Sequence, residues 1–582
     1  MVVLLTSLSF FSLNLALAQT DLGYANIGPL PTLEGVKRSG VDKSLLELTL
    51  KCDHLRKMDL RSSSDPQCII FSRHHGEEPW QQVGATEIVQ DNNSPAFTKK
   101  YLVDWNFDRP TQFKFELRDD DGRGKYDFLG QAITSDAHIA SRIGAYVTYP
   151  LTEINGTTVI PRSSLSVLGR EIKNTNKLKL QLTVSAKNIP KSKGMFAGTA
   201  DSYLEFVSVD PISKVERVIG KTQTINDSKS PYYGKVILDL DGLTDNLKDR
   251  TFKVRLKHFH TNEAHKIVGE VLVSPQQLLQ NPTLSLDFDK ANPGKERTLN
   301  FIGTSEYKEH SFLDYLQGGC QMGLCVSIDF TGSNGDPRYS NSLHYSCGDE
   351  FHQLSQYEKG ICAIGNFLEV YDNDKKFPTT GFGAIIPGSF GKVNHCFALN
   401  QVLNVDGGNS EIPGVNNILE ALKKVKGKIE FKGPTNFAPT IYSNINEVKR
   451  NMTSRPMDYK VLLILTDGQI SDFAETKKAI AEASHLPMSI IIVGVGDADF
   501  SSMDELDGDE NPLPGAARDI VQFVKLKDFF NTKTTIGQKY DLLKYQKEQA
   551  AFTSAVMAEL PKQVQASMAD RGIVPAFTAA KY

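Results

Sequence analysis

Short runs in which apolar residues alternate with polar ones, or that are rich in β-branched residues, fill the first half of the chain. They form two series, at 45–50, 67–71, 99–105 and 112–117, and then at 178–184, 201–207, 235–240 and 251–256. A period of two is typical of strands with one buried face, and turn residues separate the runs. The sequence therefore predicts two antiparallel β-sandwiches in tandem, a coarse internal repeat, over residues 43–165 and 172–300.

The pattern changes after residue 310, where apolar strands alternate with helical spacing. Strands are predicted at 324–330, 382–386, around Leu463, around Ile491 and at 520–524, and helical faces are marked by Ile361, Ile364 and Leu368 and by Val415, Ile418, Leu419, Leu422 and Val425. Alternating strands and helices favour a parallel sheet covered on both faces. We expect an α/β doubly wound domain over residues 310–560.

Two segments near the C-terminus complete this part of the chain. Phe552, Val556 and Leu560 recur at intervals of four, which favours a packed helix over a membrane helix. The last stretch, 561–582, carries no pattern that predicts an element.

The composition is that of a multidomain globular protein. The 582 residues exceed what one core supports, and 40% hydrophobic and 23% charged residues are ordinary values. A net charge of -4 argues against bulk attraction to nucleic acid, so any membrane contact must be local. Seven cysteines without a C-x-x-C pair give neither a zinc framework nor an evident disulfide scaffold, which favours a reducing compartment.

The N-terminal residues instead favour secretion. Residues 1–18 are apolar and end in Ala16-Leu-Ala18, as a signal-peptide core does, although a positive start is missing; a linker follows over 19–42. Glycosylation sequons are present at Asn92, Asn155, Asn226 and Asn451. Two localisations therefore stay open for this chain, the cytoplasm and secretion.

Acidic residues gather in two loops of the first predicted sandwich. Asp59 and Asp65 lie six apart in one loop, and Asp119, Asp121 and Asp127 follow a later strand. Ca²⁺ takes six to eight oxygen ligands, so acids from two loops at one end of a sandwich would supply most of them. The alternative is a solvated acidic turn, because Asp and Gly are common in turns.

Basic residues flank these acids, at Lys57, Arg61, Arg118, Arg123 and Lys125. Without an ion the carboxylates repel one another, and bound calcium would invert the local potential. Each basic side chain would then contribute about 1 kcal/mol near an anionic surface. We hypothesise a calcium-operated electrostatic switch that brings this tip to an anionic phospholipid membrane.

The second predicted sandwich differs in its loops. Asp201 matches the second loop acid, but His258, His260 and Lys266 stand where the later acids belong. A cationic Lys and imidazoles cannot form an oxygen cage, so no calcium is predicted here. Zinc held by these histidines and His265 is an alternative, but no cysteine is nearby, and solvated loop histidines are favoured.

A second metal site is predicted in the third domain. Asp329 follows an apolar strand and precedes Thr331 and Ser333, while Thr435 and Asp467 come far downstream, the latter after another apolar strand. Carboxylates and hydroxyls at the carboxyl ends of parallel strands suit Mg²⁺ or Mn²⁺, with a position left for a partner's acid. The alternative is that Asp329 and Thr331 cap the next turn.

Several stretches make the chain resemble one known family. They are Asp329-Phe-Thr-Gly-Ser-Asn-Gly, Gly381-Phe-Gly-Ala, Gly433-Pro-Thr-Asn-Phe-Ala-Pro, Leu465-Thr-Asp-Gly-Gln-Ile-Ser-Asp472 and Leu486-Pro-Met-Ser-Ile-Ile-Ile-Val-Gly-Val-Gly496. Together they are similar to the copine family, which joins two C2 domains to a von Willebrand A-like domain. The acids around Ser64-Asp65-Pro66 and Tyr126-Asp127 also resemble a C2 calcium site. The resemblance implies calcium-dependent membrane binding by a cytoplasmic protein that moves to the plasma membrane or other membranes with calcium.

Catalysis is not supported by the motifs. Gly381-Phe-Gly383 lacks the third glycine of a dinucleotide loop, and Gly391-Lys392 lacks the upstream glycine of a phosphate loop. No general base stands beside Asp329 and Asp467 that is not needed as a ligand. We expect a non-enzymatic adaptor that binds anionic phospholipid through its first C2 domain and protein partners through the A-like domain. The rival interpretation is a secreted adhesion protein with an extracellular ligand.

Overall fold

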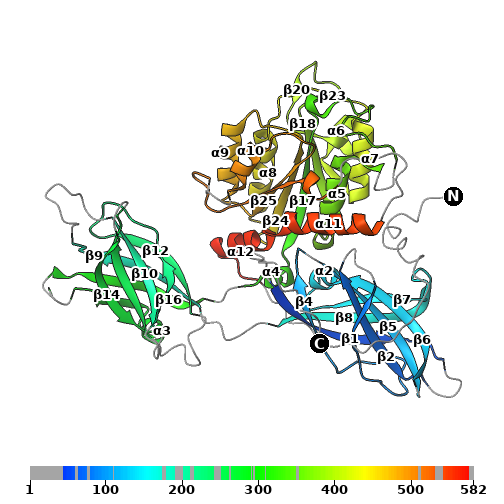
Figure 1. Cartoon of the computed structure of the whole chain (residues 1–582), viewed down its shortest axis with the longest axis horizontal. Coiled ribbons are helices and arrows are strands. Elements are labelled where there is room, and N and C mark those ends of the chain that lie inside the picture. The colour runs from blue at the N-terminus through cyan, green and yellow to red at the C-terminus, as the bar shows by residue number, and fades with distance from the viewer. Residues whose placement is uncertain are drawn as a thin grey trace. The chain divides into compact units, whose positions relative to one another are not determined.

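The structure is a computed structural model of the chain (Figure 1). It describes residues 43–575 except 59–62, 75–78, 109, 123, 173–178, 191–200, 210–214, 241–250, 261–263, 290–291, 293–294, 308–309, 349–352, 509–512 and 531–541. We refer to residues 43–172 as the first domain, 179–307 as the second domain and 310–575 as the third domain. The predicted signal-like segment 1–18, the linker 19–42 and the last residues, 576–582, lie outside the described part.

The first domain is an antiparallel β-sandwich. Its elements are β1 (Lys43–Asp53), β2 (Pro66–His74), β3 (Gln81–Ala85), β4 (Tyr101–Asn106), β5 (Thr111–Gly122), β6 (Lys125–Ser135), α2 (Asp136–Ala140), β7 (Tyr146–Thr152) and β8 (Val159–Ile172). The strand order is β3-β2-β5-β6-β7-β8-β1-β4, and β6 and β7 pair only at Gln131 and Thr152. That narrow link divides the strands into two layers of four.

The second domain repeats this topology. Its elements are β9 (Lys179–Lys187), β10 (Ser202–Val209), β11 (Glu216–Lys221), β12 (Tyr232–Asp239), β13 (Phe252–His258), β14 (Lys266–Val273), α3 (Pro275–Gln280), β15 (Thr283–Asp287) and β16 (Thr298–Tyr307). Its sheets run β11-β10-β13-β14 and β12-β9-β16-β15. If β9 is matched to β1 and the later strands follow in turn, the neighbours in each layer are the same. The predicted tandem of β-sandwiches is confirmed.

Alternation along the strands explains how each sandwich closes. In β1, Leu46, Leu48 and Leu50 are buried while the residues between them are partly exposed. In β13, Phe252, Val254 and Leu256 are fully buried in the same way. Burying such a side chain contributes about 1.5–3 kcal/mol, so a one-residue shift in register would expose the whole row.

The third domain alternates strands and helices. Its strands are β17 (Gln321–Asp329), β18 (Lys376–Phe382), β19 (Ala384–Ile385), β20 (Val393–Asn394), β21 (Phe397–Ala398), β22 (Glu411–Pro413), β23 (Glu430–Phe431), β24 (Asp458–Thr466), β25 (Met488–Gly494) and β26 (Val521–Lys525). Its helices are α4 (Phe312–Gln317), α5 (Gln356–Leu368), α6 (Leu399–Leu403), α7 (Val415–Val425), α8 (Ala438–Asn451), α9 (Phe473–Ala483), α10 (Ser501–Asp507), α11 (Leu542–Met557) and α12 (Leu560–Asp570).

The main sheet of this domain runs β21-β18-β17-β24-β25-β26, and its central strands are parallel. Successive residues of β24 enter different cores: Leu463 packs in a cluster with residues of α5 and α7, whereas Leu462 and Ile464 pack with residues of α8 and α9. Helices therefore cover both faces (Figure 1), and this explains why the strand is apolar without alternation. The predicted doubly wound α/β fold is confirmed.

Three details differ from the sequence predictions. The strand expected at 382–386 is instead β18, which ends at Phe382; Gly383, with φ +79°, turns the chain away, and β19 joins a separate small sheet. The helix expected to contain Phe552, Val556 and Leu560 is divided between α11 and α12, although all three side chains are buried. Beyond the expected end at 560, α12 packs against the domain, and Gln563 accepts a hydrogen bond from Ser489 at 2.5 Å.

Two compact units make up the chain: the first and third domains together, and the second domain alone. In the first unit, Phe107 packs against Phe312 of α4 and Phe367 of α5, with ring centroids 4.9 and 5.0 Å away. Ser554 of α11 donates a hydrogen bond to Asp108 at 2.7 Å. The first domain is therefore joined to the third through a buried aromatic contact. Among the described helices, none has the length and apolar character needed to cross a bilayer.

Candidate functional sites

Three of the five predicted calcium ligands lie in neighbouring positions at one end of the first domain. Asp119 of β5 is opposite Asp127 of β6 on one side and opposite Pro66, which follows Asp65, on the other. The backbone N–H of Asp65 donates to Asp119 Oδ1 at 2.5 Å, and Asp65 Oδ1 accepts from the N–H of Asp91 at 2.6 Å. The fold therefore brings carboxylates from two separate loops to one edge.

Asp119 has one carboxylate oxygen that its surroundings do not use. The residue is 1% exposed, and Oδ2 is buried without a hydrogen-bond partner in the described part of the chain. A buried acceptor left unpaired costs about 1–3 kcal/mol, which a cation at this position would offset. The donor set of hard carboxylate oxygens fits Ca²⁺.

The remaining predicted ligands are less closely placed. Asp121 is exposed near the β5–β6 turn, and Asp59 lies outside the described residues. No three Asp, Glu, His or Cys side chains in the described ranges come close enough to hold an ion. Like-charged carboxylates repel one another when no cation lies between them.

The basic residues around this tip differ in their contacts. Arg118 pairs with Glu116 at 2.6 Å, and its guanidinium lies 4.0 Å from the centroid of the Tyr126 ring. Lys57 and Lys125 are exposed, whereas Arg61 and Arg123 fall outside the described residues. Two lysines at this tip are thus exposed to solvent.

The third-domain cluster is compact. Asp329 is the last residue of β17 and Asp467 follows β24; the two strands are parallel neighbours, so both carboxylates lie at the same sheet edge. Thr331 donates to Asp329 Oδ1 at 2.6 Å and lies 3.0 Å from the hydroxyl of Ser333, which donates to Asp467 Oδ1 at 3.0 Å. Four of the five predicted ligands therefore form one connected group.

Thr435 reaches the same edge through its backbone. It is 8% exposed and follows Lys432, whose carbonyl accepts from Gly332 at 2.7 Å. Its own carbonyl accepts from Ser471 at 2.7 Å. This loop is therefore attached beside Thr331, although no hydrogen bond among the described residues joins the Thr435 hydroxyl to the cluster.

Burial sets the charge properties of this cluster. It raises the pKa of Asp329 above the usual carboxyl range, and the charge of Asp467 raises it further. Burial also raises the pKa of Asp467. Two carboxylates that resist ionisation together, surrounded by hydroxyl oxygens, are a donor set that fits a small divalent cation such as Mg²⁺ or Mn²⁺.

Comparison with known domain families agrees with this architecture. The C2 domain model matches residues 45–151 and 178–289, and the Copine model matches residues 342–576. Two C2 domains followed by a Copine domain are the arrangement that defines one family. The chain belongs to the copine family.

Solved structures similar to this copine-family chain include tandem C2 domains. The two C2 domains of Extended-Synaptotagmin 2 have 14% identity, a TM-score of 0.19 and coverage of 49% of this chain and 100% of that one. Their calcium-bound form has 16% identity, a TM-score of 0.18 and coverage of 46% and 98%. Human GIVD cytosolic phospholipase A2 has 11% identity, a TM-score of 0.19 and coverage of 60% and 45%.

The second C2 domain carries different residues at the matched positions. Ser202, which follows Asp201, is opposite His258, and His258 is opposite Lys266. Asp201 accepts from the N–H of Asp227 at 2.8 Å, as Asp65 does from Asp91. The loop scaffold is therefore repeated, but an imidazole and an ammonium group occupy the places of Asp119 and Asp127.

The histidines of this domain do not form a metal site among the described residues. His258 is 6% exposed, burial lowers its pKa, and its ring lies 6.5 Å from that of His260. His265 instead contacts Tyr203, whose hydroxyl lies 2.9 Å from its Nδ1.

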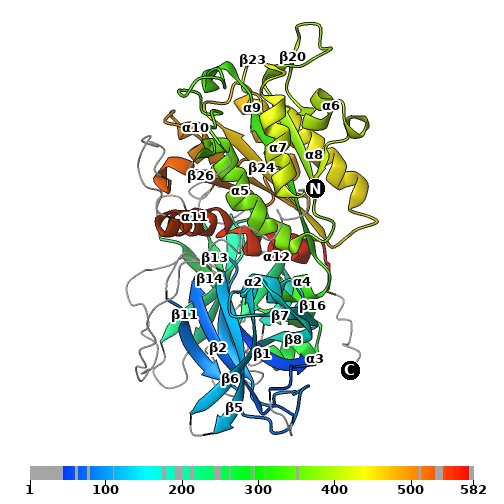
Figure 2. The same ribbon diagram turned by 90° about the vertical axis from the view of Figure 1, so that its right-hand side faces the viewer.

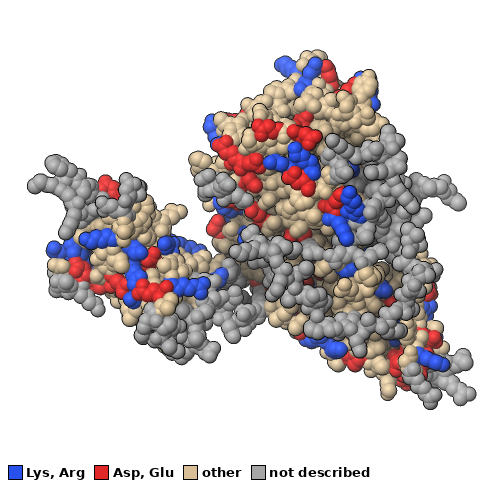
Figure 3. Space-filling view, in the orientation of Figure 1, with Lys and Arg blue, Asp and Glu red and all other residues tan. Residues whose placement is uncertain are grey.

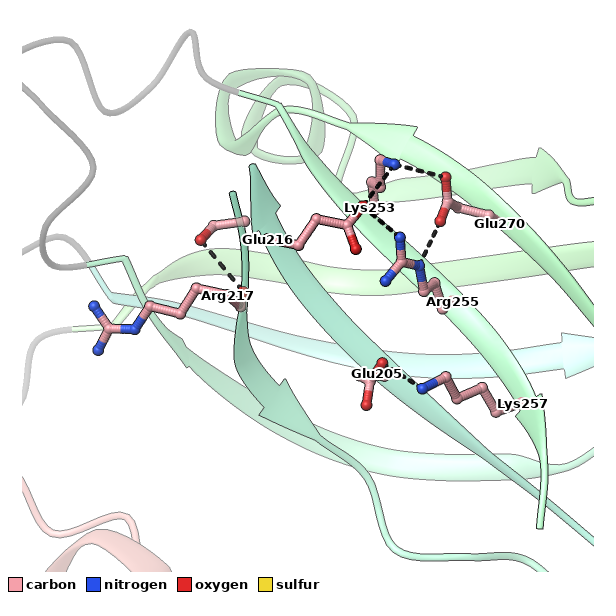
Figure 4. Close-up of polar contacts among 8 residues, drawn as sticks. Glu205, Glu216, Arg217, Lys253, Arg255, Lys257 and Glu270 are labelled. Atoms are coloured by element: carbon pink, nitrogen blue, oxygen red, sulfur yellow. Dashed lines mark hydrogen bonds and ion pairs between the residues drawn. The ribbon is translucent and has the colours of Figure 1, made fainter. Parts of the chain in front are cut away.

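One face of the second C2 domain carries a set of paired charges, shown in Figure 4. Glu216 of β11 lies between Lys253 and Arg255 of β13, at 3.0 and 2.6 Å, and Lys257 pairs with Glu205 of β10 at 2.7 Å. The basic residues of this strand are thus neutralised by acids on its neighbours.

Sequence reasoning missed the residues that support the third-domain cluster. Thr466 donates to Asp329 Oδ2 at 2.7 Å, and the amide of Asn334 lies 3.5 Å from Oδ1 of the same carboxylate. The Tyr357 hydroxyl donates to Asn334 at 2.7 Å, and the His344 ring, 3.9 Å from that of Tyr357, contacts the Asp329 carbonyl at 2.8 Å. Thr466 and Asn334 adjoin predicted ligands, whereas no local pattern marks His344 or Tyr357.

Proposed function

We propose that this protein is a calcium-dependent phospholipid-binding adaptor. Its first C2 domain recruits it from the cytoplasm to anionic membranes, and its third domain, loaded with Mg²⁺ or Mn²⁺, binds a protein partner. The calcium ligands are Asp59, Asp65, Asp119, Asp121 and Asp127. The ligands of the second metal are Asp329, Thr331, Ser333, Thr435 and Asp467.

One observation carries the membrane part of the proposal. The row formed by Asp65, Asp119 and Asp127 joins two loops, and the buried Oδ2 of Asp119 has no partner among the described residues. Calcium would supply positive charge to this row and leave coordination positions for lipid oxygens. The exposed Lys57 and Lys125 would then lie next to an anionic surface without a competing cluster of negative charge.

The experiment is co-sedimentation of the full chain with phosphatidylserine vesicles during a calcium titration. The wild type should pellet with calcium and remain in the supernatant with a chelator. The double variant Asp121→Asn and Asp127→Asn should remain in the supernatant throughout. The matched control, His258→Asn with Lys266→Gln in the second C2 domain, should pellet like the wild type. Unchanged pelleting of the first variant would place the calcium site elsewhere.

The adaptor role of the third domain rests on the connected cluster around Asp329 and Asp467. A cation bound there would accept one further oxygen ligand from a partner's carboxylate, because Mg²⁺ and Mn²⁺ favour six oxygens. Mg²⁺ should raise the melting temperature of the first unit, since a ligand at 100 times its Kd stabilises by about 2.7 kcal/mol. Asp467→Asn should remove that increase, whereas Asp336→Asn, outside the cluster, should keep it. An equal response in both variants would exclude this metal site.

A further inference from the structure

A short hairpin beside the third-domain cluster presents one aromatic side chain to solvent. It connects β19 and β20, and Phe390 near its tip is 99% exposed. Two backbone hydrogen bonds define the hairpin, from Ser389 to Ile386 at 3.1 Å and from Lys392 to Ser389 at 3.0 Å. An apolar ring of this size is seldom left wholly in water, and this one is held there by two consecutive turns.

The backbone at this position is strained. Phe390 has φ +51°, in the left-handed region that bulky residues rarely adopt, and Gly388 and Gly391 on either side also have positive φ. A glycine at 390 would adopt this conformation more readily. Strain of this kind concentrates at binding sites, where the exposed side chain has a role that outweighs its cost.

The base of the hairpin packs against the third-domain cluster. Gly383 precedes β19, and a Cβ on it would lie 2.4 Å from the Thr331 methyl group. The Gly383 carbonyl accepts from Lys432 at 3.0 Å, and the Lys432 carbonyl accepts from Gly332, next to Thr331. Figures 1 and 2 both place β20 and β23 at the end of the third domain away from α11 and α12. Phe390 is thus attached to the same edge as the cluster.

The charges at this end are mixed. Acidic and basic atoms lie near each other there in Figure 3, and Glu430 pairs with Lys432 at 2.8 Å. An anionic membrane favours a continuous basic surface, whereas the cores of protein interfaces are enriched in aromatic side chains. These features favour a polypeptide partner.

We propose that Phe390 is an apolar anchor for the partner of the third domain. The partner is a protein segment that presents an Asp or Glu to the metal and a large apolar side chain to Phe390. This inference rests on the proposed function, since the acid requires the cation. The hairpin adds specificity that the metal alone does not provide, because many proteins expose carboxylates but few pair one with a suitably spaced apolar group.

A library of linear peptides displayed on phage tests this proposal with the full chain in Mg²⁺. Selected peptides should combine an acid with a nearby large apolar residue, and Phe390→Ala should weaken them at least tenfold. Val405→Ala, at another exposed apolar residue of the domain, should change their affinity by less than twofold. Phe390→Gly should lose binding and melt no lower than the wild type, which separates lost contact from misfolding.

The outcomes distinguish this proposal from the proposed function. If peptide binding depends on Phe390 but needs neither Mg²⁺ nor the Asp467 side chain, Phe390 is an anchor and the proposed role of the metal is wrong. If binding needs Mg²⁺ and Asp467 but is equal in wild type and Phe390→Ala, the anchor proposal is wrong and the metal role stands. Reduced pelleting of Phe390→Ala with phosphatidylserine vesicles, with peptide affinity unchanged, would assign the ring to a membrane contact and overturn the proposal.

Discussion

The two C2 domains have one topology and two different loop chemistries. Asp65 and Asp201 occupy the same place before their strands, and each accepts a hydrogen bond from a loop N–H. On the neighbouring strands, however, Asp119 and Asp127 are matched by His258 and Lys266. Strand order is therefore the same in both domains. The side chains at the open end, which supply the candidate ion ligands, differ without changing the sandwich.

The domains also differ in what they pack against. The first C2 domain shares an apolar cluster with the third domain, whereas the second keeps its own around residues such as Phe206. Phe107→Ala should therefore lower the stability of the first unit by about 3–5 kcal/mol, the usual cost of removing a buried aromatic ring.

Differential scanning calorimetry of the full chain measures this effect. Only the transition of the unit that contains the third domain should move with Phe107→Ala. Phe206→Ala should move the other transition instead. A shift of both transitions by either substitution would mean that the two units do not unfold separately.

Grafting the missing acids should partly convert the second C2 domain. His258→Asp with Lys266→Asp would place three carboxylates in the row that begins with Asp201. Weak calcium uptake, with Kd in the range of about 10⁻⁴ to 10⁻³ M, is expected because the other loop acid is still absent. Calorimetric titration in the Asp121→Asn, Asp127→Asn background measures it, and complete absence of uptake would show that the row alone is insufficient.

Asp201 should contribute to stability but not to calcium binding. Its carboxylate accepts from Asp227, so Asp201→Ala should cost about 1 kcal/mol through the lost hydrogen bond. Thermal melting of the unit formed by the second domain measures the change. Vesicle pelleting of the same variant should match the wild type, and a calcium dependence altered by this substitution would contradict the assignment.

The smallest effect concerns pH. Burial lowers the pKa of His258, so the unfolded chain takes up a proton at a higher pH than the folded domain does. Stability should therefore fall as pH decreases through the unfolded-state value of about 6.5. His258→Gln should reduce this loss by a fraction of a kcal/mol in melts between pH 7 and pH 5. Identical pH profiles would mean that His258 is protonated equally in both states.

The hydrophobic pattern was sufficient to predict the architecture. Alternation in strands such as β1 indicates a strand with one buried face, and the unbroken apolar run of β24 indicates a strand buried on both faces. The pattern failed at β19, since Gly383 redirects the chain within a run that is apolar on both sides. It also left α12 unassigned, because that helix mixes polar residues such as Gln563 into its buried face.

The residues of the candidate sites were also predictable from the sequence only in part. Candidate ligands at the end of an apolar strand, such as Asp329 and Asp467, can be recognised because parallel strands end at a common edge. Support from a distant helix cannot be recognised in this way: the Tyr357 hydroxyl donates a hydrogen bond to Asn334, and that contact depends on the packing of α5. The strained backbone of Phe390 likewise has no local sequence signature.

The most direct measurement is calorimetric calcium titration of the full chain and of two matched variants, Asp119→Asn and His258→Asn. The wild type and His258→Asn should take up calcium with the same affinity, whereas Asp119→Asn should bind calcium at least a hundredfold more weakly. Equal uptake by all three proteins, or a loss confined to His258→Asn, would contradict the assignment of the calcium site to the first C2 domain.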